Sequence, residues 1–309
     1  MILTVCPNPC IDYTLYVDNF SAGKLNRVNK KVESLGGKGI NVARAVRRLG
    51  YESYCTGFMY KDGAKKYFDI LDAEGVPYIF AMCDGAVRIN TKIISLPDMA
   101  LTEINERGTP VEYQKQFELI ESVRMLSENA AIAVLSGSVP PNVDSDFYQK
   151  VAGALAKNCK FIADCEGEML LPALKLKPAL VKPNLSELEN IWGGRIKGID
   201  EALKAADFLI EKGAQSVLVS MGREGALIYD GREAYHGVAP AVEARSTVGA
   251  GDCMVAASAV ALSMGLCMEA LLKSAIAAGT AAVFGEGTGQ LTRENYDKIF
   301  PLVETGKIR

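Results

Sequence analysis

The chain has 309 residues, of which 49% are hydrophobic and 23% charged, and its formal net charge is −3. These values are typical of one large globular domain, or of a domain with a smaller appendage. The weak negative charge argues against a nucleic acid or an anionic membrane surface as the main partner. The first apolar run, 2–5, has no basic residues before it, so we expect no signal peptide, and the run 254–266 is too short to cross a bilayer.

Cysteine and histidine usage narrows the chemistry further. The eight cysteines include no C-x-x-C pair, and Cys6 and Cys10 have no histidine nearby for a zinc site. This pattern predicts a reduced, cytoplasmic protein. The one histidine, His236, lies at a predicted strand end, which disfavours hydrolase triads and leaves acid–base work to carboxylates.

One stretch combines glycines, a carboxylate and a helix start. It reads Thr247-Val248-Gly249-Ala250-Gly251-Asp252 and continues into an apolar, alanine-rich helix. Free N–H groups at a helix start suit a phosphate, and glycines allow close approach to the backbone. Asp252 is either a helix cap or a base that takes a proton from a hydroxyl.

The chain begins with a predicted strand, 2–5, and a Pro-Asn-Pro loop that leads to Asp12. A carboxylate just beyond a strand end is either a turn residue or a ligand contact at the edge of an open sheet. Residues 13–34 alternate loosely and predict strands of a small sheet.

A glycine-rich loop follows, Gly36-Gly37-Lys38-Gly39, and then a helix that begins near Asn41 and ends at Gly50. The loop does not match G-x-x-x-x-G-K-[ST], so it is not a Walker A loop. It forms either a positively charged anion nest or a flexible loop with a solvated lysine.

Residues 85–94 alternate strictly, which places Arg88, Asn90 and Lys92 on one strand face. This face is either a sugar-phosphate surface or an ordinary solvated one. Residues 102–105 are predicted to form the partner strand.

From about residue 110 the pattern alternates between strands and helices. Asn184 and Glu187 follow the predicted strand 180–182 and lie three residues apart near a helix start, either as a capping pair or as a site for hydrated magnesium. Expected strands are 53–58, 77–82, 131–135, 161–164, 216–220, 226–229 and 233–237. Expected helices are 63–74, 111–127, 146–157, 169–176, 200–212, 270–284 and 294–303.

Together these elements predict an α/β fold with a mainly parallel central sheet and helices on both faces. Residues 12–34 and 86–106 do not follow the alternation of strands and helices, and they predict a small β lid. The large domain is then 1–11, 35–85 and 107–309.

Four motifs in order give the chain a resemblance to the ribokinase-like (PfkB) carbohydrate kinases along essentially its whole length. They are Asn8-Pro9-Cys10-Ile11-Asp12, Gly36-Gly37-Lys38-Gly39-Ile40-Asn41-Val42-Ala43, Lys182-Pro183-Asn184-Leu185-Ser186-Glu187 and Thr247-Val248-Gly249-Ala250-Gly251-Asp252. The first motif, Arg88-Ile89-Asn90 and Thr102-Glu103-Ile104-Asn105 look like the branch that contains 1-phosphofructokinase and tagatose-6-phosphate kinase.

The resemblance implies a role for each position. Asp252 would be the base, and the backbone of Gly249, Ala250 and Gly251 the anion hole. Substrate contacts would come from Asp12, Gly37, Lys38, Gly39, Asn41, Arg88 and Asn90. Nucleotide contacts would come from Lys182, Asn184, Glu187, Ser220, Gly222, Thr247 and the region of Gly285–Gly289. Glu187 would also organise Mg²⁺, in part through water.

The implied activity is ATP- and magnesium-dependent phosphorylation of a ketohexose monophosphate, with fructose 1-phosphate as first choice and tagatose 6-phosphate as second. A monovalent cation and a homodimer through the lid are further expectations. The alternative from another class is a non-catalytic sugar-phosphate sensor, which retention of Asp252 and its glycines disfavours. A dinucleotide-binding oxidoreductase is disfavoured because the first strand has no G-x-G-x-x-G turn.

Overall fold

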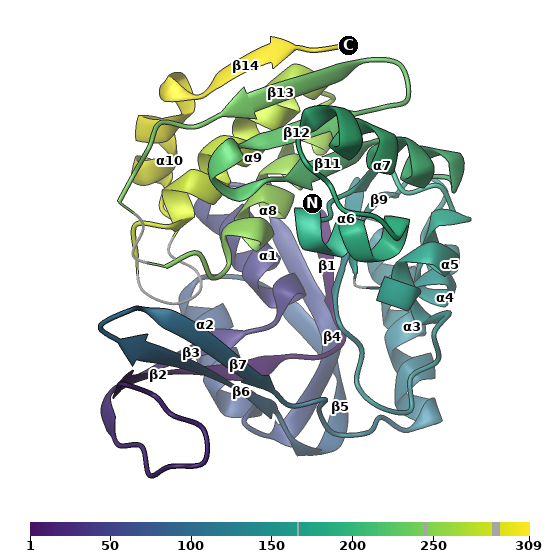
Figure 1. Cartoon of the computed structure of the whole chain (residues 1–309). Helices are drawn as coiled ribbons and strands as arrows, with labels where there is room; N and C mark the ends of the chain where they lie inside the picture. The colour runs from purple at the N-terminus through teal and green to yellow at the C-terminus, as the bar shows by residue number, and fades with distance from the viewer. Residues whose placement is uncertain (166, 244–245, 286–290) are drawn as a thin grey trace.

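The computed structural model of the chain describes residues 1–165, 167–243, 246–285 and 291–309. A ten-stranded sheet forms the body of the molecule, and a separate four-stranded sheet projects from it (Figure 1). The expected fold class is confirmed.

The large sheet has the strand order β14-β13-β12-β11-β10-β9-β8-β1-β4-β5. Its parallel strands are β1 (Ile2–Cys6), β4 (Ser53–Asp62), β5 (Tyr78–Ala86), β8 (Ile132–Gly137), β9 (Lys160–Cys165), β10 (Leu180–Val181) and β11 (Val217–Ser220). Its antiparallel strands, at one edge, are β12 (Ala226–Tyr229), β13 (Ala234–Val238) and β14 (Glu304–Lys307).

Helices cover both faces of this sheet, as the continuous burial along its parallel strands, such as β1 and β8, requires. Leu3 of β1 packs into one apolar core and its neighbour Ile2 into the other. The helices are α1 (Lys38–Arg48), α2 (Ala64–Ala73), α3 (Tyr113–Ser127), α4 (Phe147–Ala154), α5 (Leu170–Leu174), α6 (Leu185–Trp192), α7 (Ile199–Glu211), α8 (Ala250–Ser263), α9 (Met268–Ala282) and α10 (Arg293–Ile299). Helices α1, α8 and α9 pack together on one face, and α8 contacts both of the others.

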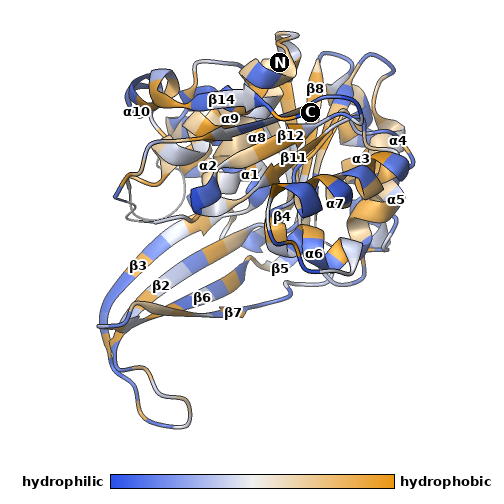
Figure 2. Cartoon of the chain, turned by 45° about the horizontal axis from the view of Figure 1, so that its top comes forward, coloured by the Kyte–Doolittle hydropathy of each residue, from blue (hydrophilic) through white to orange (hydrophobic). Residues whose placement is uncertain are grey.

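The small sheet has the order β3-β2-β6-β7, with β3 (Val28–Gly36), β2 (Cys10–Asp18), β6 (Arg88–Leu96) and β7 (Ala100–Asn105). Strand β2 starts four residues after β1 ends, so the chain passes directly from one sheet to the other. Figure 2 shows the small sheet extending away from the large one, with hydrophilic and hydrophobic residues interspersed along its strands. The small sheet predicted within 12–34 and 86–106 is thus present.

The end of the chain differs from the prediction of a helix over 294–303. Helix α10 ends at Ile299, a 3-10 turn covers Phe300–Leu302, and β14 then pairs with β13 at the edge of the large sheet. Within the described residues, no helix is both long enough and apolar enough to span a membrane.

Candidate active site

Asp252 lies in the first turn of α8, whose N-cap is Gly249 with φ 83°. The Asp252 side chain is buried, and its Oδ2 accepts a hydrogen bond of 2.8 Å from Nδ2 of Asn41 on α1. Asp252 is therefore not the N-cap of α8, and its carboxylate is aimed at the neighbouring helix.

The environment of Asp252 changes its acidity. Burial, and after it the negative charge of Asp164, raise the pKa of the Asp252 carboxyl to about 6. Lys38, the Asn41 amide and Lys182 act in the opposite direction. A carboxylate with a pKa close to neutrality is suited to accept a proton from an alcohol and release it again.

A chain of charged side chains surrounds this carboxylate. Lys182 Nζ lies 3.2 Å from Asp164 Oδ1, and Lys38 Nζ lies 3.7 Å from Asp164 Oδ2 and 3.6 Å from Glu187 Oε1. Asp164 and Lys182 are both buried. The structure therefore joins the first residue of α1, the end of β9, the segment after β10 and the start of α6 in one electrostatic network.

The start of α8 presents backbone N–H groups beside a cation. A Cβ atom placed on Gly251 would lie 3.6 Å from Lys182 Nζ, so this ammonium group stands close to the first turn of the helix. Ala250 N–H already donates to the Thr247 carbonyl at 3.3 Å. The combination of a positive helix end and an ammonium group favours an anion at this place.

Asn184 and Glu187 form the capping pair that their spacing allows. Asn184 is the N-cap of α6, its Oδ1 accepts from Glu187 N at 2.8 Å, and Glu187 Oε2 accepts from Asn184 N at 2.9 Å. Asn184 also forms an isolated parallel bridge with Ser220 at the end of β11. Glu187 thus uses one oxygen for the cap, and its other oxygen faces Lys38.

The glycine-rich loop is compact rather than flexible. Gly37 is the N-cap of α1 with φ 121°, and a Cβ atom at this position would lie 2.8 Å from Cys6 Sγ. At Gly39 the same atom would lie 2.5 Å from the Val5 carbonyl oxygen. Only glycine allows the helix start to pack this closely on the end of β1, and this contact places Lys38 and Asn41.

A second group of polar residues lies on the small sheet. Strands β2 and β6 pair in parallel with Asp12 opposite Asn90, and Asn90 Nδ2 donates to Asp12 Oδ1 at 3.1 Å. The Cys10 thiol donates to the same oxygen at 3.7 Å. Asp12 and Asn90 are both buried, so this is not an ordinary solvated sheet face.

Arg88 and Lys92 share the face of Asn90 but have different surroundings. Arg88 Nη1 donates to the Glu106 carbonyl at 2.8 Å, and Nη2 lies 3.5 Å from the Asn8 carbonyl. Lys92 Nζ lies 3.9 Å from Glu103 Oε1 across the β6–β7 pair. Arg88 is therefore held by backbone at the junction of the two sheets, whereas Lys92 points along the small sheet.

The remaining predicted nucleotide contacts are more dispersed. Gly222 begins the 3-10 turn Gly222–Glu224 directly after β11, and Thr247 is exposed before α8. Gly285 lies just after α9, and the rest of the predicted stretch, 286–289, lies outside the described residues.

Asp164 is a functional candidate that the sequence reading missed. It lies near the C-terminal end of β9, opposite Ser136 of the parallel strand β8. Its position near the carboxyl end of a predicted parallel strand was a usable signal, because such ends carry the ligand contacts of open α/β sheets.

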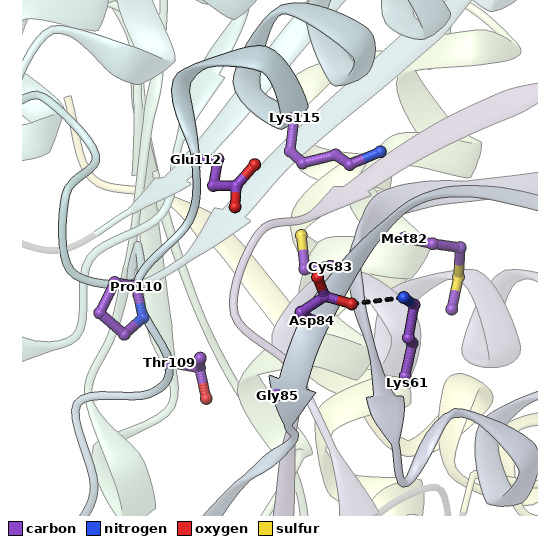
Figure 3. Close-up of a pocket in the computed structure, with 9 residues that line it drawn as sticks. All are labelled: Lys61, Met82, Cys83, Asp84, Gly85, Thr109, Pro110, Glu112 and Lys115. Carbon is purple, nitrogen blue, oxygen red and sulfur yellow. Dashed lines mark ion pairs between the residues drawn. The ribbon is translucent and has the colours of Figure 1, made fainter.

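A cavity of about 620 Å³ lies elsewhere, beside the ends of β4 and β5 and the segment before α3 (Figure 3). An ion pair between Lys61 and Asp84 crosses it, and Glu112 and Lys115 stand on its other side. None of its lining residues is a predicted site residue, so this cavity does not mark the candidate site.

The site thus joins the buried Asp252 carboxylate, a positive helix start and two buried or half-buried carboxylates near lysines. These are the parts that phosphoryl transfer needs, since this reaction depends on positioning and on neutralising charge. The class defined by the fold and the site is a phosphotransferase that acts on an alcohol.

Residues 5–295 match the model of the pfkB family carbohydrate kinases, and the chain belongs to this family. It is 34% identical over 309 residues to 1-phosphofructokinase of Bacillus subtilis (strain 168), covering 100% of both chains. It is 29% identical over 308 residues to a tagatose-6-phosphate kinase of Staphylococcus epidermidis, covering 98% of this chain and 99% of the relative.

A solved structure of phosphofructokinase-2 from Escherichia coli in complex with potassium superposes with a TM-score of 0.87 at 30% identity. The match covers 97% of this chain and 98% of that one. Family and relatives together make the chain an ATP-dependent sugar-phosphate kinase.

Proposed function

We propose that the chain transfers the γ-phosphoryl group of ATP to fructose 1-phosphate and forms fructose 1,6-bisphosphate. The observation that carries the proposal is the buried Asp252 carboxylate, with a pKa of about 6, at the positive start of α8. The full-length similarity to 1-phosphofructokinase of Bacillus subtilis supports this substrate over others.

In this proposal Asp252 takes the proton of the acceptor hydroxyl. The hydroxyl oxygen then bonds to the γ-phosphorus, and the bond from that phosphorus to ADP breaks. Asn41 holds the carboxylate in place through its 2.8 Å hydrogen bond. The backbone of Gly249, Ala250 and Gly251, with Lys182 beside it, stabilises the negative charge of the transferring group.

The sugar phosphate lies between the two sheets in this proposal. Asp12, oriented by Asn90, accepts hydrogen bonds from sugar hydroxyls, while the backbone of Gly37 and Gly39 borders the ring. Lys38 and Arg88 face the phosphate that the substrate already carries. In this proposal the chain consists of a large domain and a lid over 12–34 and 86–106. The lid closes over the sugar and excludes water.

On the nucleotide side, Lys182, Asn184, Glu187, Ser220, Gly222, Thr247 and Gly285 border ATP. Among the described residues, no group of three or more His, Cys, Asp or Glu side chains is arranged so that it could hold a metal ion by itself. Mg²⁺ needs only one or two carboxylates besides substrate phosphates and water, so Glu187, with Asp164 close by, fits it. When bound, the ion would neutralise phosphate charge.

A second candidate substrate is tagatose 6-phosphate, because a tagatose-6-phosphate kinase covers almost the whole chain at 29% identity. Both acceptors carry a phosphate and a free hydroxyl, so the same residue types serve either. A non-catalytic sensor would give no function to the proposed base, Asp252, or to the anion-binding start of α8.

The test is ADP release with ATP and Mg²⁺ on five acceptors: fructose 1-phosphate, tagatose 6-phosphate, fructose 6-phosphate, fructose and adenosine. We expect saturable turnover with the highest kcat/KM on fructose 1-phosphate. A higher kcat/KM on tagatose 6-phosphate would support the second candidate. Turnover confined to an unphosphorylated acceptor would contradict the roles of Arg88 and Lys38, and ATP binding without any turnover would favour a sensor.

Three further properties belong to this proposal. The small sheet carries the exposed apolar side chains Val28, Leu101 and Ile104, which supports a homodimer through the lid. The eight cysteines are all free thiols, seven of them buried, which fits a reducing compartment such as the cytoplasm. A requirement for a monovalent cation stays a prediction.

A further inference from the structure

Asn8 lies in the loop after β1, where the chain leaves the large sheet for the small one. Its side chain is buried, with 4% of its surface exposed, and none of the roles above uses it. Its Nδ2 donates to the Arg107 carbonyl at 3.1 Å and to Ser138 Oγ at 3.2 Å. One amide therefore joins the β1 loop, the segment that returns from the lid, and the loop after β8.

The same residue also contacts Arg88 through its backbone. The Arg88 guanidinium spans two carbonyls, with Nη1 2.8 Å from Glu106 O and Nη2 3.5 Å from Asn8 O. Glu106 precedes Arg107, the residue that the Asn8 amide holds. One support of the guanidinium is thus the Asn8 backbone, and the other, Glu106, is held both by Ile89 of β6 and through its neighbour Arg107 by the Asn8 amide.

The contact between Asn8 and the returning segment is tight. Gly108 has φ +102°, and a Cβ atom there would lie 2.7 Å from Asn8 Oδ1 and 3.5 Å from Arg88 Cδ. Within the described part of the chain, Asn8 Oδ1 and Arg88 Nε are both buried without a hydrogen-bond partner. A hollow of about 470 Å³ lies alongside, lined in part by Arg88, Glu106 and Arg107.

We propose that Asn8 is a positioning residue that fixes the Arg88 guanidinium, and with it the Ser138 hydroxyl, for the phosphate of the sugar substrate. The proposal rests on the proposed function, because it requires Arg88 to bind that phosphate. A guanidinium binds phosphate oxygens through charge-assisted hydrogen bonds, and the Arg88 side chain lines the hollow beside Asn8. Asn8 would then act on binding of the sugar phosphate and leave ATP binding unchanged.

Three substitutions at Asn8 test this role. Asn8→Ala removes both amide donors, and we expect it to raise the KM for fructose 1-phosphate by about tenfold. Asn8→Asp keeps the shape but places a carboxylate against two acceptor oxygens and beside Arg88, so we expect a larger rise. Asn8→Ser retains one donor and should fall between wild type and Asn8→Ala. In all three the KM for ATP should stay within about twofold of wild type.

A double-mutant cycle with Arg88→Ala tests whether Asn8 acts through Arg88. We expect Asn8→Ala to add less than about twofold to the KM in the Arg88→Ala background. Gln116→Ala is the matched control. Gln116 is also a buried amide that donates to two carbonyls, that of Asn142 at 2.8 Å and that of Val111 at 3.4 Å. This variant should leave both KM values unchanged.

The outcomes distinguish the two levels of the proposal. If Arg88→Ala itself leaves the KM for the sugar phosphate unchanged while ATP is still turned over, the phosphate role of Arg88 fails and the role of Asn8 with it. If Arg88→Ala raises this KM but Asn8 variants do not, or if their effects multiply with that of Arg88→Ala, only the role of Asn8 is overturned. Equal rises in both KM values would indicate general loss of structure, which thermal unfolding would register, and would also reject the role.

Discussion

Asp252 is a buried carboxyl group whose environment raises its pKa. Its folded pKa of about 6 exceeds the ordinary value of 3.8, so the folded state binds a proton more tightly than the unfolded state. This contribution stabilises the fold at acidic pH and is lost as the pH rises through about 6. At neutral pH the buried charge destabilises the native state, and this charge is the one that the proposed base needs.

Asp252→Asn is therefore expected to stabilise the protein at pH 8, by about 1–3 kcal/mol, because it removes a desolvated charge while its oxygen can still accept from Asn41. The advantage should shrink below pH 6, where the wild-type carboxyl is protonated. Urea unfolding at pH 8 and at pH 5 measures both values. A variant less stable than wild type at pH 8 would contradict this account of Asp252.

Asp164 is expected to set the pH range of activity through its charge. Asp164→Asn removes a negative charge that raises the pKa of Asp252, so the base stays ionised at lower pH. The acidic limb of kcat/KM, expected near pH 6 in the wild type, should move down by about one pH unit. Asp207→Asn, whose carboxylate only accepts from Tyr229 OH at 3.0 Å, should leave the limb in place. A limb that moves upward or stays fixed in Asp164→Asn would rule out this coupling.

At the scale of elements, the sequence predicted strands and helices well where the periodic pattern of apolar residues extended over many residues. Helix α1 begins within the glycine-rich loop and ends before Gly50, close to its predicted range. Strands β6 and β7 lie near the residues for which alternation predicted a pair of strands. Strand β14 was missed because Glu304–Lys307 is short and carries no alternation of apolar residues, and only pairing with β13 makes it a strand.

The candidate site was predictable in its residue types but less so in its contacts. Asn184 and Glu187 left two interpretations open, and the structure shows the capping box while Glu187 Oε1 also faces Lys38. Asp164 and Asn8 could not be linked to the site from spacing, because their partners lie on distant segments. Such contacts arise from the topology of the two sheets and not from local periodicity.

The junction between β2 and β3 gives a prediction at this scale. Gly36 lies opposite Cys10, and a Cβ atom at Gly36 would lie 2.5 Å from Asp12 Oδ2 and 2.8 Å from Cys10 Sγ. Gly36→Ala should displace the Asp12 carboxylate and raise the KM for the sugar phosphate by about tenfold to a hundredfold. Gly306→Ala, where a Cβ atom meets no other atom within 4 Å, is the control. An unchanged KM in a folded Gly36→Ala variant would argue against Asp12 as a substrate contact.

At the scale of the whole molecule, the small sheet projects from the body and its strand β7 is exposed along its full length (Figure 2). Exposed edge strands with apolar side chains favour association with another chain. We expect the wild type to sediment as a dimer and the double variant Leu101→Glu/Ile104→Glu as a monomer. Met264→Glu, at an equally exposed site after α8, should remain dimeric. A monomeric wild type, or a dimeric double variant, would refute the lid interface.

Asp252, in the first turn of α8, has the central role in the proposed reaction. The decisive measurement is the turnover of Asp252→Asn with ATP and fructose 1-phosphate, in a variant whose fold and ATP affinity match those of the wild type. We predict a loss of about 10²–10⁴-fold in kcat, the range that a general base contributes. Turnover close to that of the wild type in this folded, ATP-binding variant would contradict the assignment of Asp252 as the base.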